Sequence, residues 1–176
     1  MTMDVLRLST DWARAEVFSA KIVWLASLIV ITTSIGFAYF GKTPMAKAYF
    51  WPMLVAGLFL VAVGVGLYMA NKPRIAKFEN EYKANPENFI KSELARAQKS
   101  NGELSFVLKV LPMIILLGAV LVIIVSNPTW RAIGITLVLL SLILLMVDTN
   151  TDARNAVYLR QLESITKADE ASDKNN

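Results

Sequence analysis

Apolar residues gather in four long stretches, separated by segments rich in charge. The stretches cover residues 18–40, 48–70, 104–125 and 129–147. Each holds roughly the 20 residues that an apolar helix needs to cross about 30 Å of hydrocarbon. Backbone N–H and C=O groups at that depth must pair within their own segment, so each stretch is predicted to be a transmembrane helix. The predicted fold class is an all-α integral membrane protein with four spans.

Two short turns join the stretches in pairs. They cover residues 41–47 and 126–128, and each contains a proline, Pro44 or Pro128, where the next helix begins. Proline fits the first position of a helix because its missing N–H has no helical partner there. We therefore expect two antiparallel transmembrane hairpins that pack as a four-helix bundle.

The two turns also share a spacing. Three positions recur at an offset of 84 residues: Pro44, Lys47 and Ala48 match Pro128, Arg131 and Ala132. A duplicated hairpin would explain the match, since many membrane proteins contain internal repeats. A generic helix-start signal used twice is the simpler explanation, so three matched positions are weak support for duplication.

The segment between the second and third spans, residues 71–103, is predicted to form two short amphipathic helices. Pro73 opens the first, Asn85-Pro86 separates the two, and residues 99–102 end the second. Apolar residues recur at helical spacing in both parts. They form a predicted cytoplasmic interaction face, made of Phe78, Tyr82, Phe89, Ile90 and Leu94.

The two ends of the chain are predicted to differ in order. Residues 1–17 form an N-terminal arm, in which a helix starts near Trp12 and continues into the first span. The fourth span is expected to end at Asp148, and a helix resumes from about Asp152. Residues 148–167 thus form a helical extension with Tyr158, Leu162 and Ile165 on its apolar stripe. Residues 168–176 are polar and mixed in charge, which is typical of a disordered tail.

Basic residues predict the orientation. They are abundant in the arm, the central segment and the tail, whereas the outer turns and their flanks hold only Lys42, Lys47 and Arg131. The positive-inside rule then places both termini and the central segment in the cytoplasm, most simply at a bacterial inner membrane. We interpret residues 18–40 as a retained anchor rather than a cleaved signal, because the apolar run is long and acids precede it.

Composition excludes several chemistries. The chain has no cysteine and no histidine, so thiolate nucleophiles, imidazole bases and the usual zinc sites are absent. Residues 148–152 begin like a calcium-binding loop, but Ala153 stands where that loop requires glycine. Acidic residues are interleaved with the basic ones, which argues against nucleic-acid binding. We predict no cofactor, no metal and no catalytic residues.

Polar groups close to the spans are the remaining site candidates, because such groups mark functional positions in membranes. Lys109 and Pro112 suggest a pore-lining residue beside a hinge, or a lysine that reaches the headgroups and a tolerated proline. Thr32, Thr33 and Ser34 offer a polar or small helix surface, and Arg131 offers a contact to lipid or an external partner.

Three functions are compatible with the sequence. The first is a small non-enzymatic membrane protein that acts through protein–protein interaction, as an accessory, regulatory or toxin-protective subunit, with the lipid bilayer and a protein as partners. The alternative is a homo-oligomeric channel or channel-like effector, lined by the residues just named. The third is a lipid-directed enzyme, for which Asp148 with Lys109 or Arg154 would be needed.

Overall fold

The protein is all-helical in the part of the chain that the structure describes. The structure is a computed structural model that describes the backbone of residues 2–173 and the side chains of residues 5–167. Its elements are α1 (Thr2–Phe40), α2 (Pro44–Ala48), α3 (Phe50–Ala84), α4 (Pro86–Ile124) and α5 (Pro128–Asp173). Four of these helices are long and apolar enough to cross a membrane, which confirms the expectation of four long apolar helices.

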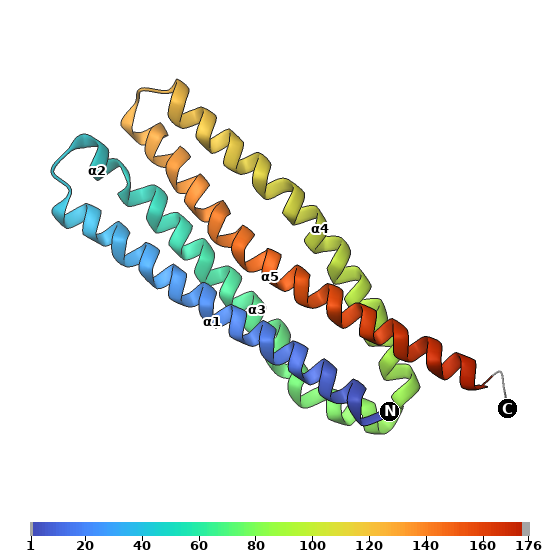
Figure 1. The fold of residues 1–176 in the computed structure, drawn as a ribbon. Coiled ribbons are helices and arrows are strands. Elements are labelled where there is room, and N and C mark those ends of the chain that lie inside the picture. The colour runs from blue at the N-terminus through green and yellow to red at the C-terminus, as the bar shows by residue number, and fades with distance from the viewer. Residues whose placement is uncertain (1, 174–176) are drawn as a thin grey trace.

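The long helices lie side by side in two pairs. α1 packs along α3 and α4 packs along α5, while contacts between the pairs are fewer (Figure 1). The N-terminus and the turn between α3 and α4 lie at one end of the molecule, and α2 lies at the other. We call the first end the head, which consists of residues 2–17, 71–103 and 148–167. The four apolar stretches make up the apolar half.

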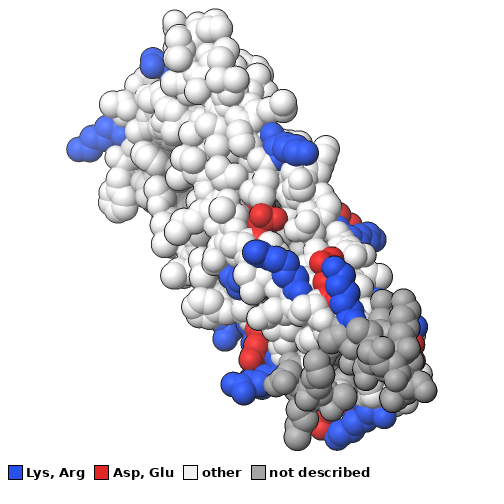
Figure 2. All heavy atoms as spheres, turned by 45° about the vertical axis from the view of Figure 1, so that its right-hand side comes forward, with Lys and Arg blue, Asp and Glu red and all other residues white. Residues whose placement is uncertain are grey.

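Charged residues are distributed unevenly between the head and the apolar half. Figure 2 shows cationic and anionic side chains gathered over the head, whereas the apolar half is mostly uncharged on that face. All acidic residues of the sequence lie outside the four apolar stretches and outside both turns at the far end. A large apolar surface remains exposed in the apolar half. It is largest on α4, where only 11% of the residues in the most apolar 18-residue stretch are buried.

Two helices begin at prolines where the sequence predicts them, each after a capping side chain. The Thr43 hydroxyl accepts a hydrogen bond from the Ala46 N–H at 3.1 Å, and Pro44 follows as the first residue of α2. The Asn85 side chain accepts one from the Asn88 N–H at 2.9 Å before Pro86 starts α4. Each side chain pairs an N–H that has no partner within its helix.

Three predicted interruptions are wrong, because the helices continue through them. α3 passes Pro73, α4 passes Gly102, and α5 passes Asp148 without a break. Each position lies between buried residues of its own helix, as Pro73 does between Asn71 and Phe78. Packing on both sides therefore outweighs the cost of one proline or glycine, which is about 1–3 kcal/mol in a helix interior.

Both predicted end segments also differ from the structure. α1 begins at Thr2 rather than near Trp12, because Val5 and Ser9 already pack inside the head. α5 extends to Asp173, so most of the predicted tail at 168–176 is helical in the structure. Residues 174–176 of that prediction lie outside the described residues.

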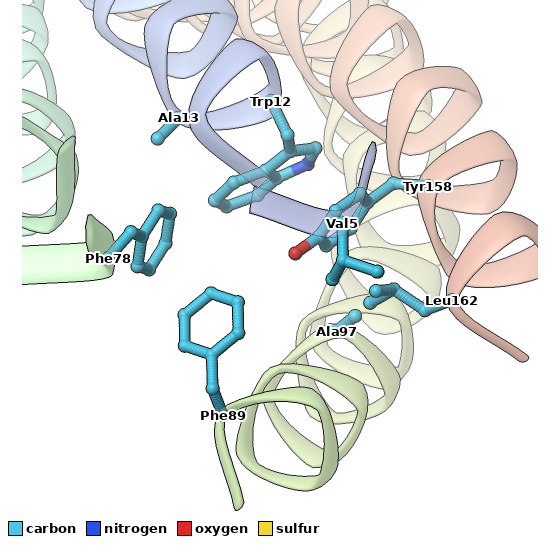
Figure 3. Close-up of a cluster of buried hydrophobic side chains, with 8 residues drawn as sticks. All are labelled: Val5, Trp12, Ala13, Phe78, Phe89, Ala97, Tyr158 and Leu162. Carbon is cyan, nitrogen blue, oxygen red and sulfur yellow. The ribbon is translucent and has the colours of Figure 1, made fainter. Parts of the chain in front are cut away.

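The head has a hydrophobic core of its own. Figure 3 shows its side chains pointing toward one another from all four long helices. Trp12 comes from α1, Phe78 from α3, Phe89 from α4 and Tyr158 from α5. The Trp12 and Tyr158 rings stack at 5.5 Å between centroids, and Phe78 meets Phe89 edge to face at the same distance. This core joins the two helix pairs at one end.

The two halves of the chain repeat one another. α4 begins and ends 84 residues after α1, the offset that relates the two prolines of the turns. Within the head core the same offset relates buried residues in three couples: Val5 with Phe89, Ala13 with Ala97, and Phe78 with Leu162. It also relates two buried asparagines, Asn71 and Asn155. The 84-residue offset noted at three turn positions therefore also relates buried residues of the head core.

Candidate functional site

A buried hydrogen-bond chain crosses the head from α1 to α4. The Tyr158 hydroxyl of α5 donates to Glu93 Oε2 at 2.8 Å, and Ser9 Oγ lies 2.8 Å from the same hydroxyl. Burial, together with the charge of Glu93, raises the pKa of Tyr158 well above its usual value. The phenol therefore keeps its proton for Glu93, so Ser9 is the donor in the other bond. Three helices are tied through one side chain.

Glu93 is held on its other side by Arg96. The guanidinium donates to both carboxylate oxygens, from Nε at 2.9 Å and Nη2 at 2.7 Å. It lies 4.0 Å above the Trp12 ring, a cation–π contact between α4 and α1. Burial alone would lower the pKa of Arg96, but the bond to Glu93 outweighs this and raises it. Glu93 and Arg96 are three residues apart on α4, and their pair lies inside the head rather than on its surface.

A second ion pair links α1 to α5. Arg154 Nη2 donates to Glu16 Oε1 at 2.8 Å, to Ser19 Oγ at 2.8 Å and to Thr151 Oγ1 at 3.1 Å. The Glu16 side chain is only 3% exposed. A carboxylate that is so deeply buried needs this partner, because leaving it unpaired would cost several kcal/mol.

We call these hydrogen bonds and ion pairs the head ties. Beside them lies a cavity of about 420 Å³. All four long helices line it, at the level where the head meets the apolar half. Its walls include Trp12 and Glu16 of α1, Arg74 of α3, Lys99 of α4 and Asp148 of α5. Apolar residues close the side that faces the apolar half, namely Leu67, Leu104, Val107 and Val147.

The ionic groups of this cavity differ in how they are paired. Glu16 and Arg96 are engaged by the bonds described above, and Lys99 lies 3.8 Å from Glu103 at the exposed rim. Arg74 donates to the Asn71 side chain at 2.9 Å and has no acidic partner within 4.0 Å among the described residues. Burial, followed by the nearby charge of Arg96, lowers the pKa of Arg74. An anion bound in the cavity would favour the charged form of Arg74 and so counteract both causes.

The residues proposed from sequence as pore or contact sites lie elsewhere. Lys109, Pro112 and Arg131 are exposed on the outside of α4 and α5. Thr32 and Thr33 are exposed on α1, where each bonds to a carbonyl of its own helix. Ser34 is buried instead and donates to the Phe50 carbonyl at 2.7 Å, which fixes α1 against α3. The structure does not bring these six residues together.

The predicted cytoplasmic interaction face is turned inward. Phe78 and Phe89 are each 2% exposed, and Tyr82, Ile90 and Leu94 pack against them as part of the head core. In this chain the five residues contact one another and residues of α1 and α5. Any partner of the head would meet its polar outer surface.

Sequence reasoning missed the polar residues that build the ties and the cavity. Ser9, Glu16 and Arg74 look like ordinary charged or polar positions of an arm and a loop. The partners of Ser9 and Glu16 are more than 100 residues away, and Arg74 bonds to Asn71 while its other donors face the cavity. One signal was available in the 84-residue offset, which relates Ser9 to Glu93 and Trp12 to Arg96. Among the described residues no group of three potential ligands could hold a metal ion.

No protein-family model matches the chain, and neither curated proteins nor solved structures give a match.

Proposed function

We propose that this chain is a four-span integral membrane protein, built from two antiparallel hairpins, that acts through protein–protein interaction rather than catalysis. The head and both termini face the cytoplasm, as the distribution of basic residues favours. In this proposal the spans anchor the protein, and the head presents a fixed charged surface to a protein partner.

One observation carries the proposal: the head is a folded body with its own buried core. Side chains of all four long helices meet there, and two buried ion pairs, Glu93–Arg96 and Glu16–Arg154, lock it. Spanning a bilayer requires none of this structure. A rigid head costs little conformational entropy when it binds, which favours recognition of a partner by its outer face.

The exposed cations of α3 make the proposal testable. Lys77 lies on the outer surface of the head, and Lys42 lies at the opposite end of the molecule. Affinity purification in mild detergent should recover a stoichiometric protein partner with the wild type and with Lys42→Gln. Lys77→Gln combined with Lys72→Gln should recover less of it. Repeated recovery of the protein alone from wild-type membranes would contradict the proposal.

A channel formed by several copies is the second candidate, and the exposure of α4 favours it. Lys109 lies on this exposed surface, between large apolar side chains such as Phe106 and Met113, which are 68% and 71% exposed. A pore shared by several copies would need such an outward-facing polar residue in its lining. A ring-shaped oligomer in nanodiscs with conductance that Lys109→Gln alters would support this alternative.

A further inference from the structure

The cavity beside the head ties spans the level at which the predicted membrane ends. On three helices its lining residues lie on both sides of a predicted span boundary. These pairs are Leu67 and Arg74 on α3, Leu104 and Lys99 on α4, and Val147 and Asp148 on α5. The cavity is therefore charged toward the head and apolar toward the bilayer. A phospholipid has the same polarity over the same depth.

Two side chains in the charged part have unused bonding capacity. Arg74 carries five N–H donors, and the bond to Asn71 uses one of them. Asp148 is half-buried and has no ion pair or side-chain hydrogen bond among the described residues. Among the described residues that line the cavity, Arg74 is thus a cation and Asp148 a carboxylate without an ion-pair partner.

We propose that this cavity binds a phospholipid with a zwitterionic headgroup. The phosphodiester accepts hydrogen bonds from Arg74, with Lys99 nearby at the rim, and the ammonium group of an ethanolamine headgroup pairs with Asp148. Arginine presents a planar fork of donors that suits phosphate oxygens, and these charge-assisted bonds are stronger than neutral ones. The upper part of an acyl chain lies along Leu104, Val107 and Val147.

The charged side chains that line the cavity, paired and unpaired, determine which lipid headgroup it should prefer. Most other charges of the lining are already paired, Glu16 with Arg154 and Arg96 with Glu93, so the cavity holds no large excess of cations. A purely anionic headgroup would satisfy Arg74 but leave Asp148 unpaired. A soluble phosphate ester would leave the apolar wall without a partner. A zwitterionic lipid engages all three features.

Native mass spectrometry of the full chain in detergent, titrated with defined lipids, tests the proposal. Phosphatidylethanolamine should bind more tightly than phosphatidylglycerol, and Arg74→Gln should weaken its binding about tenfold, as expected for a lost charge-assisted contact. Lys77→Gln, on the outer surface of the same helix, should change binding less than about twofold. Equal binding by wild type and Arg74→Gln would overturn the proposal.

A second variant keeps the test independent of folding. Asp148→Asn retains the shape of the side chain and should abolish the preference for ethanolamine over glycerol headgroups without preventing lipid binding. An unchanged preference would overturn the assignment of Asp148. Phosphoethanolamine without acyl chains should not compete, and effective competition would overturn the lipid assignment. The inference rests on the proposed membrane location, which carbonate extraction of the same samples reports separately.

Discussion

Gly118 of α4 and Gly134 of α5 approach each other so closely that a Cβ on either residue would lie 2.8 Å from the carbonyl oxygen of the other. The contact is reciprocal, so the two backbones touch directly at this crossing. Helices in membranes pack through such small residues, because lipid supplies no hydrophobic force that would drive them together.

Gly118→Ala should therefore push α4 and α5 apart. We expect a loss of about 1–3 kcal/mol from overpacking, although alanine favours a helix by about 1 kcal/mol over glycine. Gly36→Ala is the matched control, because a Cβ at Gly36 meets nothing within 4 Å. The thermal unfolding midpoint in detergent should fall for the first variant and stay level or rise for the second. Equal midpoints would refute the close crossing.

Tyr158→Phe removes the hydroxyl that connects Ser9 to Glu93. Both partners are buried, at 0% and 5% exposure, and each loses a hydrogen bond while the ring stacking on Trp12 remains. We expect a loss of about 1–3 kcal/mol in the free energy of unfolding. Tyr39→Phe, at a position that is 82% exposed, should change stability by less than about 0.5 kcal/mol. Chemical denaturation in detergent distinguishes the two, and comparable losses would argue against the buried chain.

Glu16 and Arg154 form the clearest pair for a double-mutant cycle. Arg154→Met should cost about 3–5 kcal/mol, because it leaves the buried Glu16 carboxylate without its partner. Glu16→Gln with Arg154→Met should recover part of that loss, since the uncompensated charge is gone. Additive losses in the cycle would show that the two side chains are not coupled.

The absence of native cysteine makes the orientation directly measurable. Single cysteines at Lys42 and Ser126, in the two turns at the far end, should react with a membrane-impermeant maleimide added to intact cells. Cysteines at Lys77 and Asn88, on the exposed surface of the head, should react only after the cells are permeabilised. The reverse pattern would place the head outside and contradict the orientation that the basic residues predict.

Local patterns were sufficient to predict the helices and several of their ends. The apolar stretches and the helix starts at Pro44, Pro86 and Pro128 involve neighbours within a few residues. The amphipathic stripe with Tyr158 and Leu162 was also correct, since both are buried in the head. Such features depend on helical spacing, which a sequence displays directly.

The cavity and the ties could not be predicted in the same way. Ser9 and Tyr158 are 149 positions apart, so their bond depends on how four helices meet. Local signals also misled where packing opposed them: Pro73 and Gly102 are typical of helix ends, yet each lies inside a helix whose neighbouring residues are buried. The approach of distant helices decides both the polar ties and the continuity of α3 and α4.

The shared core of the two repeats imposes an order on the assembly of the protein during synthesis. α1 and α3 can pair as soon as both have left the ribosome, but Val5 and Phe78 then still lack Phe89 and Leu162, which are made later. The nascent chain must keep this apolar surface from wrong contacts until α5 is almost complete. A stable head can therefore form only after Leu162 has been synthesised.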